Sequence, residues 1–489
     1  MTRYAKHFGV YERVRCNTCV DSLAEVQVPG SSASSSTWIL SVRTHDSRSQ
    51  IHAARLIIAT GLTNTPMLPS LPNSPAFAGP ILHTRTLARD HAALTAPGIA
   101  DVIVLGGSKS SIDAAYMLAT ARPGITAHLV IRDSGNGPAW LAKSYATPLK
   151  TPLEMLLMRR AVTCFGLPLW DDESVGYTWM RKLLHRTVIG RAVVDAFFAV
   201  IKSDMIAGMG LADHPETKKL MPSVDPFFTA TSLGIDNYEG DLRELIREGR
   251  ITVHTADIAR LEADTVLLSS GEEVPANAII CATGWQERPN LTLEAPLTPK
   301  ALGMPYYAIE KDALVARADA EIFARFPKLR SQPPQNPHAS HNVTSNPSFH
   351  PFLLYKGMVP PAYLSQRNLA YAGFMACIAG PAMWHVQALW MTAFLDEALP
   401  VPLPEQGEVE YETVLYSRWS RWRGPQGPGA KHVECVFEAL QYLDMLMRQL
   451  GLEWWRKGGV VRELVEAYES KDYAGVVEEW MRGRKGTSV

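Results

Sequence analysis

The chain has 489 residues, 46% of them hydrophobic and 20% charged, and its formal net charge is −1 because 48 Lys and Arg nearly balance 49 Asp and Glu. This composition excludes a disordered chain, a collagen-like repeat, a disulfide scaffold and a polytopic membrane protein. The charge gives no electrostatic reason to expect nucleic acid or an anionic membrane surface as a partner. At roughly 150 residues per domain, the length allows about three domains.

Compartment signals point to a cytoplasmic protein. Six cysteines are too few for a stapled secreted fold, and the N-terminus has no apolar signal-peptide core. The apolar stretch 371–395 is interrupted by Gly380-Pro381, so we expect a buried helix and no integral membrane segment, which needs about 20 uninterrupted apolar residues. The histidines of the Pro/Asn/Ser-rich loop 331–351 are interpreted as solvated, and no metal site is predicted; they are His338, His341 and His350.

Cys16 and Cys19 form an isolated CxxC pair. One interpretation is a redox pair of the kind found in disulfide reductases. The other, which we favour, is two small buried residues at the entrance to a strand.

The first elements in chain order predict a three-stranded meander. The segments 20–28 and 38–44 alternate in hydrophobicity, and 51–59 ends in the apolar run LIIA before Thr60-Gly61. Residues 62–98 are rich in proline and contain a linker.

A strand–turn–helix–strand unit follows. The apolar strand 101–105 leads into Gly106-Gly107-Ser108-Lys109-Ser110-Ser111, then a helix at 112–121 and a second strand at 127–131. Against the pattern GxGxxG, the turn keeps the first glycine and has serine at the third and sixth positions. Serine is small enough to let the backbone approach a pyrophosphate, which the amides at the helix start would bind. We therefore predict a dinucleotide-binding turn.

The end of the second strand indicates which dinucleotide binds. Arg132 comes first and Asp133 second, and Lys109 adds a positive charge in the turn. An arginine at this position suits the 2′-phosphate of NADP, so we favour NADP over NAD; the alternative is that both are ordinary surface charges.

The remaining chain is expected to be mainly helical around one further set of strands. Residues 138–212 predict a helical insertion rich in Met, Trp and Phe, and 241–248 predict a helix. Strands are expected at 251–254, 265–268 and 277–282. Residues 400–489 predict a helical tail, with 432–450 the clearest amphipathic helix.

Two strands end in the same string: LIIATG closes with Thr60-Gly61 and IICATG with Thr283-Gly284. Between the first of them and the glycine turn lies FAGPILH, in which Phe77, Gly79 and His83 fit FxGxxxH. This order of motifs resembles the flavin-containing and Baeyer–Villiger monooxygenases, the class B flavoprotein monooxygenases. Three later segments, GGSKSSIDAA, IDNYEG and RNLAYAGFMACIAGPAMWHVQALW, also look like that family.

The resemblance implies an α/β fold with two interleaved Rossmann-like dinucleotide-binding domains, a β-meander and added helices. The expected domains are a partial FAD-binding domain with meander and linker at 1–97 and an NADP-binding domain at 98–285 with the helical insertion at about 138–212. After these domains, the chain is expected to return to the FAD-binding domain at 286–400. It is then expected to end in a helical C-terminal extension at 401–489.

By the same resemblance, NADPH would pass a hydride to FAD, and one atom of O₂ would enter a small lipophilic organic substrate while the other leaves as water. His83 would couple NADPH binding to domain movement.

The resemblance also implies which residues bind the cofactors. Besides the glycine turn and Arg132, they would be Thr60, Gly61, Phe77, Gly79, Thr283, Gly284 and Gly380. Aromatic residues of the insertion would either line an apolar substrate site or pack in the core; they are Trp140, Phe165, Trp170, Trp179, Phe197 and Phe198.

One expected part is missing from the sequence. The family opens with a GxGxxG turn for the FAD pyrophosphate, but before Gly61 only Gly9 and Gly30 occur, and neither follows a buried strand. The interpretation we favour is that the sequence is truncated at its N-terminus and that the intact protein is an NADPH- and FAD-dependent monooxygenase. Two alternatives stay open: a truncated or degenerate, non-catalytic NADP-binding protein, and a disulfide or quinone reductase that uses Cys16 and Cys19.

Overall fold

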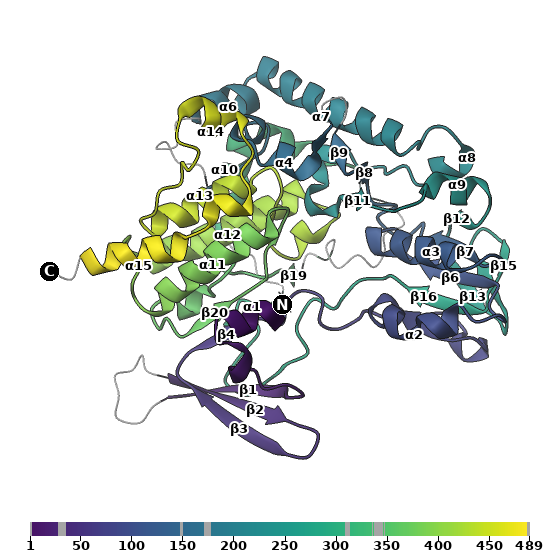
Figure 1. Cartoon of the computed structure of the whole chain (residues 1–489), viewed down its shortest axis with the longest axis horizontal. Coiled ribbons are helices and arrows are strands. Elements are labelled where there is room, and N and C mark those ends of the chain that lie inside the picture. The colour runs from purple at the N-terminus through teal and green to yellow at the C-terminus, as the bar shows by residue number, and fades with distance from the viewer. Residues whose placement is uncertain are drawn as a thin grey trace.

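The computed structural model describes residues 2–27, 36–146, 150–170, 178–308, 313–334, 336, 346 and 348–486. The expected α/β fold is present, with a parallel sheet, a separate meander and a large helical body (Figure 1).

The parallel sheet has five strands in the order β12-β7-β6-β16-β5. Their bounds are β5 Ile81–His83, β6 Asp101–Leu105, β7 Thr126–Ile131, β12 Ile251–Thr255 and β16 Ala278–Cys281. The strands predicted at 101–105, 127–131, 251–254 and 277–282 are therefore confirmed. The sheet also takes an edge strand, β5, from the segment interpreted as linker, because Ile81–His83 pairs in parallel with β16.

Alternate residues of these strands face two different cores, as the period of two requires. Val102 and Val104 pack with helix α3 (Lys109–Ala121), whereas Ile103 and Leu105 pack under a small antiparallel sheet. That sheet consists of β13 (Ile258–Leu261), β14 (Thr265–Leu268) and β15 (Glu273–Pro275), with an antiparallel hairpin between the last two, and it includes the strand predicted at 265–268. The glycine turn thus follows a strand buried on both faces.

The meander consists of β1 (Cys19–Gln27), β2 (Ser36–Arg43) and β3 (Arg48–Ala53), with β17 (Thr292–Leu293) parallel to β1. The strand predicted at 51–59 is divided in the structure. β3 ends at Ala53, and β4 (Leu56–Ile58) leaves the meander to pair with β20 (Leu369–Tyr371). The apolar residues of β4 find a buried partner there, since Ile58, Leu369 and Tyr371 share one core.

The segment 401–489 is largely helical, as predicted, and it packs into the body of the molecule. Its helices α12 (Gln406–Arg423) and α13 (Ala439–Gln449) form the largest hydrophobic core together with α11 (Gly380–Leu395) and the insertion at 138–212. The helix predicted at 432–450 begins only at Ala439, because Glu434–Cys435 forms β22 beside β21 (Ala376–Cys377). Helix α11 is largely buried, as expected.

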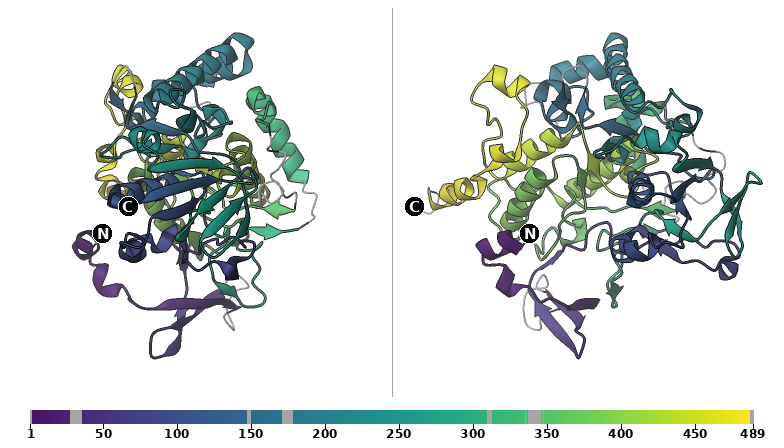
Figure 2. Two further views of the ribbon diagram at one scale, coloured as in Figure 1. Left: turned by 90° about the vertical axis from the view of Figure 1, so that its right-hand side faces the viewer. Right: turned by 45° about the vertical axis from the view of Figure 1, so that its right-hand side comes forward.

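The other elements complete the body (Figure 2). The insertion opens with short strands before its helices: β8 Leu141–Lys143, β9 Tyr145–Ala146, β10 Thr151–Pro152, α4 Leu153–Leu157, α5 Arg160–Thr163, α6 Thr178–Arg186 and α7 Val188–Gly208. Elsewhere lie α1 Thr2–His7, α2 Leu87–Leu94, α8 Pro215–Lys218, β11 Gly234–Asp236, α9 Leu242–Arg247, β18 Tyr306–Tyr307, α10 Ala313–Arg325, β19 Phe349–His350, α14 Val460–Val465 and α15 Val476–Gly486. Among the described helices, none combines the length and apolar character that crossing a bilayer requires.

Candidate functional site

The glycine turn has the backbone geometry that a phosphate-binding turn requires. Gly106 has φ +146°, and a Cβ added there would lie 2.6 Å from the carbonyl oxygen of Ala282. A Cβ at Gly107 would lie 2.6 Å from the carbonyl oxygen of Gly137. Both positions therefore exclude side chains, and the turn brings bare backbone to the carboxyl edge of the sheet.

The helix after the turn begins without a side-chain cap, although the Ser111 amide donates to the Ser108 carbonyl oxygen at 3.1 Å. Ser108 is the N-cap residue of α3, but its side chain makes no capping hydrogen bond. The hydroxyl of Ser111 instead donates to the Ser108 carbonyl oxygen at 2.6 Å. The first-turn amides of a helix have no intrahelical acceptor and carry the positive end of the helix dipole. This terminus, flanked by exposed Ser108 and Ser110, fits a dinucleotide pyrophosphate.

The two predicted cations behave differently. Arg132 is exposed directly beyond β7, and its guanidinium makes no ion pair with any described residue. The ammonium of Lys109 pairs with Asp113 one turn along α3 and lies 4.5 Å from the ring centroid of Tyr238. Lys109 therefore already has a carboxylate partner, whereas Arg132 has none among the described residues; the role of either cation in binding a phosphate stays a prediction.

His83 is buried at the end of β5, with 4% of its surface exposed. Its Nε2 donates to the carbonyl oxygen of Gly284 at 3.0 Å, and its Nδ1 accepts from the amide of Arg85 at 3.1 Å. Burial lowers the pKa of His83. The ring is therefore neutral and satisfied by backbone partners. We call the two ATG strand ends the first crossover (Thr60-Gly61) and the second crossover (Thr283-Gly284), and the His83 ring holds the second crossover in place.

Phe77 and Gly79 hold the first part of the FxGxxxH segment, whose last residue is His83, against the sheet. Phe77 is buried in the core under β13–β15, and a Cβ at Gly79 would lie 2.2 Å from the carbonyl oxygen of Asn277, just before β16. With His83 bound to Gly284 beyond the strand, the FxGxxxH segment is attached at both ends of β16.

The segment that follows the first crossover is hydrogen-bonded to the second. The hydroxyl of Thr283 donates to the Met67 carbonyl, and the amide of Met67 donates to Gly284 at 3.0 Å. Gly61 and Gly284 both have positive φ, +68° and +86°, which glycine adopts without strain. Thr60 is exposed immediately before Gly61.

Gly380 begins helix α11, whose N-terminus also lacks a side-chain cap. The strand just before it holds Cys377, which lies in register with Cys435 of β22. Burial raises the pKa of the Cys435 thiol. This cysteine pair has no local signature, since its members are 58 positions apart in the sequence; the pairing of β21 with β22 identifies it.

Cys16 and Cys19 are free and exposed, and Cys19 is the first residue of β1. The interpretation as residues entering a strand holds for Cys19, but the expected burial is wrong because both side chains are exposed at the start of the meander.

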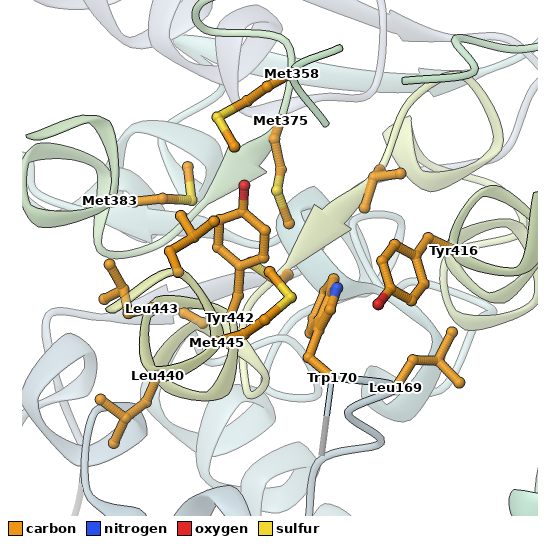
Figure 3. Close-up of a cluster of buried hydrophobic side chains, with 14 of the residues drawn as sticks. Leu169, Trp170, Met358, Met375, Met383, Tyr416, Leu440, Tyr442, Leu443 and Met445 are labelled. Carbon is orange, nitrogen blue, oxygen red and sulfur yellow. The ribbon is translucent and has the colours of Figure 1, made fainter. Parts of the chain in front are cut away.

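The aromatic residues of the insertion mostly pack in cores. Trp140 is fully buried and donates to the carbonyl oxygen of Val224 at 2.7 Å, and Phe165 stacks on Phe197 at 4.1 Å. Trp170 lies among Met358, Met375, Met383, Tyr416, Tyr442 and Met445 (Figure 3). Phe198 is also buried, and Trp179 alone of the six is exposed. The packing interpretation is therefore correct for five of the six.

The described residues contain no cluster of three metal-ligating side chains. His338 and His341 lie outside the described residues, and His350 stacks on Tyr306. Within 2–27 and 36–58, the chain forms α1, a single 3₁₀ turn and meander strands, with no strand–glycine turn–helix unit.

The comparisons with known proteins agree with this architecture. No protein-family profile matches the chain. The FAD-dependent monooxygenase rstn6 of Aspergillus nomiae is 31% identical over 99% of this chain and 84% of its own length. The FAD-dependent monooxygenase resA of Aspergillus sclerotiorum is also 31% identical, over 100% of this chain and 84% of its own length.

Among solved structures, the open crystal structure of cyclohexanone monooxygenase superposes with a TM-score of 0.51, at 14% identity, over 91% of this chain and 80% of that one. That likeness shows the shared fold. The identity to the two Aspergillus proteins over nearly the whole chain goes further: this chain is an oxidoreductase that belongs to the FAD-dependent monooxygenase family.

Proposed function

We propose that the protein uses NADPH to drive insertion of one oxygen atom of O₂ into a small lipophilic organic substrate. The observation that carries the proposal is the N-terminus of α3, which has no side-chain cap, at Gly106 and Gly107, together with Arg132 at the end of the neighbouring strand, which makes no ion pair with the described residues. The backbone amides would hold the pyrophosphate, and the Arg132 guanidinium would contact the 2′-phosphate.

The chain's own residues hold and orient the cofactors. When bound, NADPH and FAD together supply the hydride and the activation of O₂, so that NADPH, a proton, O₂ and substrate give NADP⁺, oxygenated product and water. The crossovers at Thr60-Gly61 and Thr283-Gly284 and the start of α11 at Gly380 would face FAD. His83 would keep the second crossover fixed while it remains neutral. Because its ring nitrogens already bind backbone groups, we assign it no proton transfer.

The lipophilic substrate, together with a role in secondary metabolism, is a prediction from the family resemblance. The described aromatic residues of the insertion give it no support, because five of them are packed in cores. Supplying a cyclic ketone and a thioether separately as probes, under ¹⁸O₂ with FAD added, tests the reaction. A product containing one ¹⁸O atom and NADPH consumption that depends on O₂ are expected; NADPH binding without turnover would favour a non-catalytic NADP-binding protein.

Direct binding tests the nucleotide assignment. Arg132→Ala should weaken NADPH binding about tenfold to a hundredfold, because one charge-assisted contact to phosphate is lost, and should leave NADH binding unchanged. Arg247→Ala, in α9 of the same unit, is the matched control. An unchanged preference for NADPH in Arg132→Ala would remove Arg132 from the site.

A further inference from the structure

Helix α7 presents an apolar side to solvent along its length (Figures 1 and 2). Its buried residues Gly190, Val194 and Phe198 recur every four positions and face the core. On the opposite side, four large aliphatic residues are 46% to 79% exposed, namely Val188, Ile189, Val193 and Val200. Ala192, Ala196, Ala199 and Ser203 are exposed between them. We call these eight residues the open face. Such a contiguous apolar group marks an interaction site, whereas scattered apolar residues are ordinary on a surface.

The two edges of the open face carry different side chains. Positions seven apart lie almost on one line along an α-helix, since seven residues make nearly two turns. Val193 and Val200 therefore form one edge of the open face, and Asp195 and Lys202 run along the other. The Asp195 and Lys202 side chains are 57% and 41% exposed. A partner must therefore be apolar along one edge and oppositely charged at two points along the other.

A second copy of α7 meets this requirement in one orientation. Two copies of a chain usually pair about a twofold axis, so that the same surface of each copy forms the interface. When that axis makes the two helices antiparallel, like edges meet, and the valines of one copy contact the valines of the other. A parallel pair would instead set the valine edge of one copy against the charged edge of the other.

The charges also match in the antiparallel pair. Asp195 lies three positions before the middle of α7 (Val188–Gly208), and Lys202 lies four positions after it. Antiparallel helices that cross at their middles therefore bring the Asp195 of each copy opposite the Lys202 of the other. The whole helix carries two cations, Arg191 and Lys202, and two carboxylates, Asp195 and Asp204, so two copies do not repel each other.

The length of α7 sets the expected strength of the contact. Its 21 residues span about 31 Å. A contact along one such helix falls in the class of small interfaces, which bury less than about 1,200 Å² in total and join partners reversibly. We therefore expect a dimer that depends on concentration.

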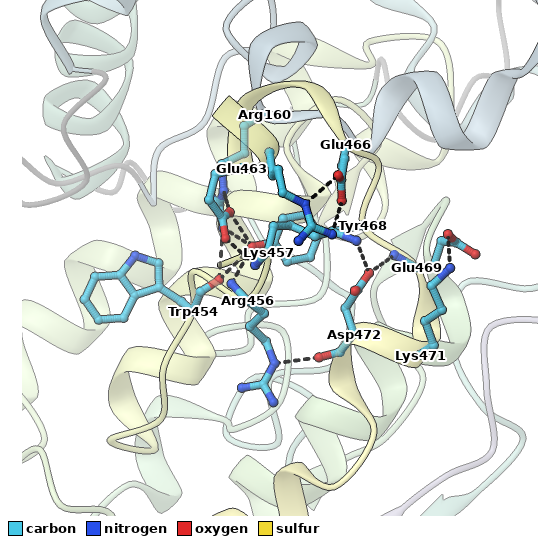
Figure 4. Close-up of polar contacts among 11 residues, drawn as sticks. Arg160, Trp454, Arg456, Lys457, Glu463, Glu466, Tyr468, Glu469, Lys471 and Asp472 are labelled. Atoms are coloured by element: carbon cyan, nitrogen blue, oxygen red, sulfur yellow. Dashed lines mark hydrogen bonds and ion pairs between the residues drawn. The ribbon is translucent and has the colours of Figure 1, made fainter. Parts of the chain in front are cut away.

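Exposed valines also occur on α14, but there they do not form an extended face. Val460 and Val461 are 62% and 72% exposed at the start of a helix of only six residues. The cation beside them, Arg462, already pairs with Glu466 in the same chain at 2.7 Å (Figure 4). Helix α7 is more than three times as long and has room for a partner helix.

We propose that the open face of α7 pairs with the open face of a second copy of this chain, antiparallel and about a twofold axis, to form a reversible dimer. Ala196 and Ala199 would lie near the axis, where small side chains let two helices approach to about 8 Å. Asp195 and Lys202 would pair across the interface twice. They would extend the pairs that they make within each chain with Lys328 and Asp225. Such a dimer does not depend on the oxygenation chemistry.

Sedimentation velocity of the full chain between about 1 and 100 µM tests the dimer without any cofactor. The unaltered chain should change from monomer to dimer across this range. Ala196→Arg should stay monomeric throughout, because a long charged side chain would stand between the two helices. The matched control is Ala92→Arg, the same change at an exposed alanine of α2, which should dimerise like the unaltered chain. Far-UV circular dichroism should be the same for both variants, since both alanines are exposed.

Reversing the edge charges tests the antiparallel orientation. Asp195→Lys and Lys202→Asp should each weaken dimerisation about tenfold, because each sets like charges opposite one another at two places. The double variant Asp195→Lys/Lys202→Asp should regain most of the lost affinity, since opposite charges then face one another again.

Three results would overturn the proposal. The first is an unaltered chain that stays monomeric at about 100 µM, which would assign the open face to a different partner. The second is a dimer that persists in Ala196→Arg, which would place the interface elsewhere. The third is a double variant that dimerises no better than either single variant, because Asp195 and Lys202 would then not face one another.

Discussion

His83 in β5 donates its Nε2 hydrogen to the carbonyl oxygen of Gly284, 3.0 Å away, across 201 positions of sequence. The bond connects two motifs that the sequence shows only as separate strings, the FxGxxxH segment and the second ATG. It explains why a histidine is needed there, since one nitrogen must donate to the crossover while the other accepts from the amide of Arg85.

Replacing His83 by Ala should lower the free energy of unfolding by about 1–3 kcal/mol, because buried backbone partners lose their hydrogen bonds. Urea unfolding measures this, with the exposed His91→Ala in α2 as the control. The pH dependence of NADPH oxidation in His83→Ala should keep its shape. A variant of normal stability that has lost one limb of the pH profile would instead make His83 a proton donor or acceptor.

Gly106→Ala should damage the dinucleotide turn. The new Cβ would meet the Ala282 carbonyl at 2.6 Å in a backbone conformation that L-residues avoid. We expect a loss of about 1–3 kcal/mol in stability or, if the turn shifts instead, at least tenfold weaker NADPH binding. Gly98→Ala, where a Cβ meets no atom within 4 Å, should change neither quantity in the same titrations.

The buried ion pair between Arg160 of α5 and Asp444 of α13 ties the insertion to the C-terminal helices. The same guanidinium also binds Glu463 at 2.9 Å and the Trp454 carbonyl at 3.0 Å. Arg160→Met leaves two buried carboxylates without their cation, so unfolding should become easier by about 3–5 kcal/mol. Arg43→Met, which breaks an exposed pair with Asp21, should have no measurable effect on the urea midpoint. Equal effects of the two changes would contradict this account.

His185 should make stability depend on pH. Burial lowers its pKa from 6.5 to about 4, and its Nε2 lies 3.0 Å from the Cys164 carbonyl oxygen. The unfolded chain takes up this proton below pH 6.5, but the folded chain does so only near pH 4. The free energy of unfolding therefore falls as pH is lowered across this window, by about 3 kcal/mol for this residue.

Urea unfolding between pH 7.5 and pH 4.5 checks this in the unaltered chain and in His185→Gln. All other titrating groups are common to the two proteins, so the difference between their slopes isolates His185. Parallel slopes would contradict this account, because they would mean that His185 takes up its proton over the same pH range in the folded and the unfolded chain.

The exposed cysteines Cys16 and Cys19 should react readily with alkylating agents, although oxygenation activity should not require them. Iodoacetamide at pH 8 should modify Cys16 and Cys19 quickly, whereas burial raises the pKa of Cys281 to about 11 and should protect it until the chain unfolds. Mass spectrometry of tryptic peptides distinguishes these sites. Cys16→Ser/Cys19→Ser should keep NADPH-driven oxygenation; complete loss of activity would support the reductase alternative.

Much of the nucleotide-binding unit could be predicted because its signals are local. A run of apolar residues at 101–105, glycines at 106 and 107 and an Ala-rich helix specify strand, turn and helix within about 20 positions. Gly106 and Gly107 are explained by backbone geometry alone. The divided third strand was missed for the opposite reason, since the separation of β4 from β3 depends on β20, more than 300 positions away in the chain.

The sequence by itself determined the fold class, the family and the position of the dinucleotide turn, because backbone conformation and strand burial follow from neighbouring residues. Only the tertiary structure decided what the side chains do. It paired Lys109 with Asp113 beside Tyr238 and left Arg132 open, and it placed most of the insertion's aromatic residues in the core. The physical reason is that charge availability and burial depend on which distant segments pack together, and a linear pattern of residue types does not contain that information.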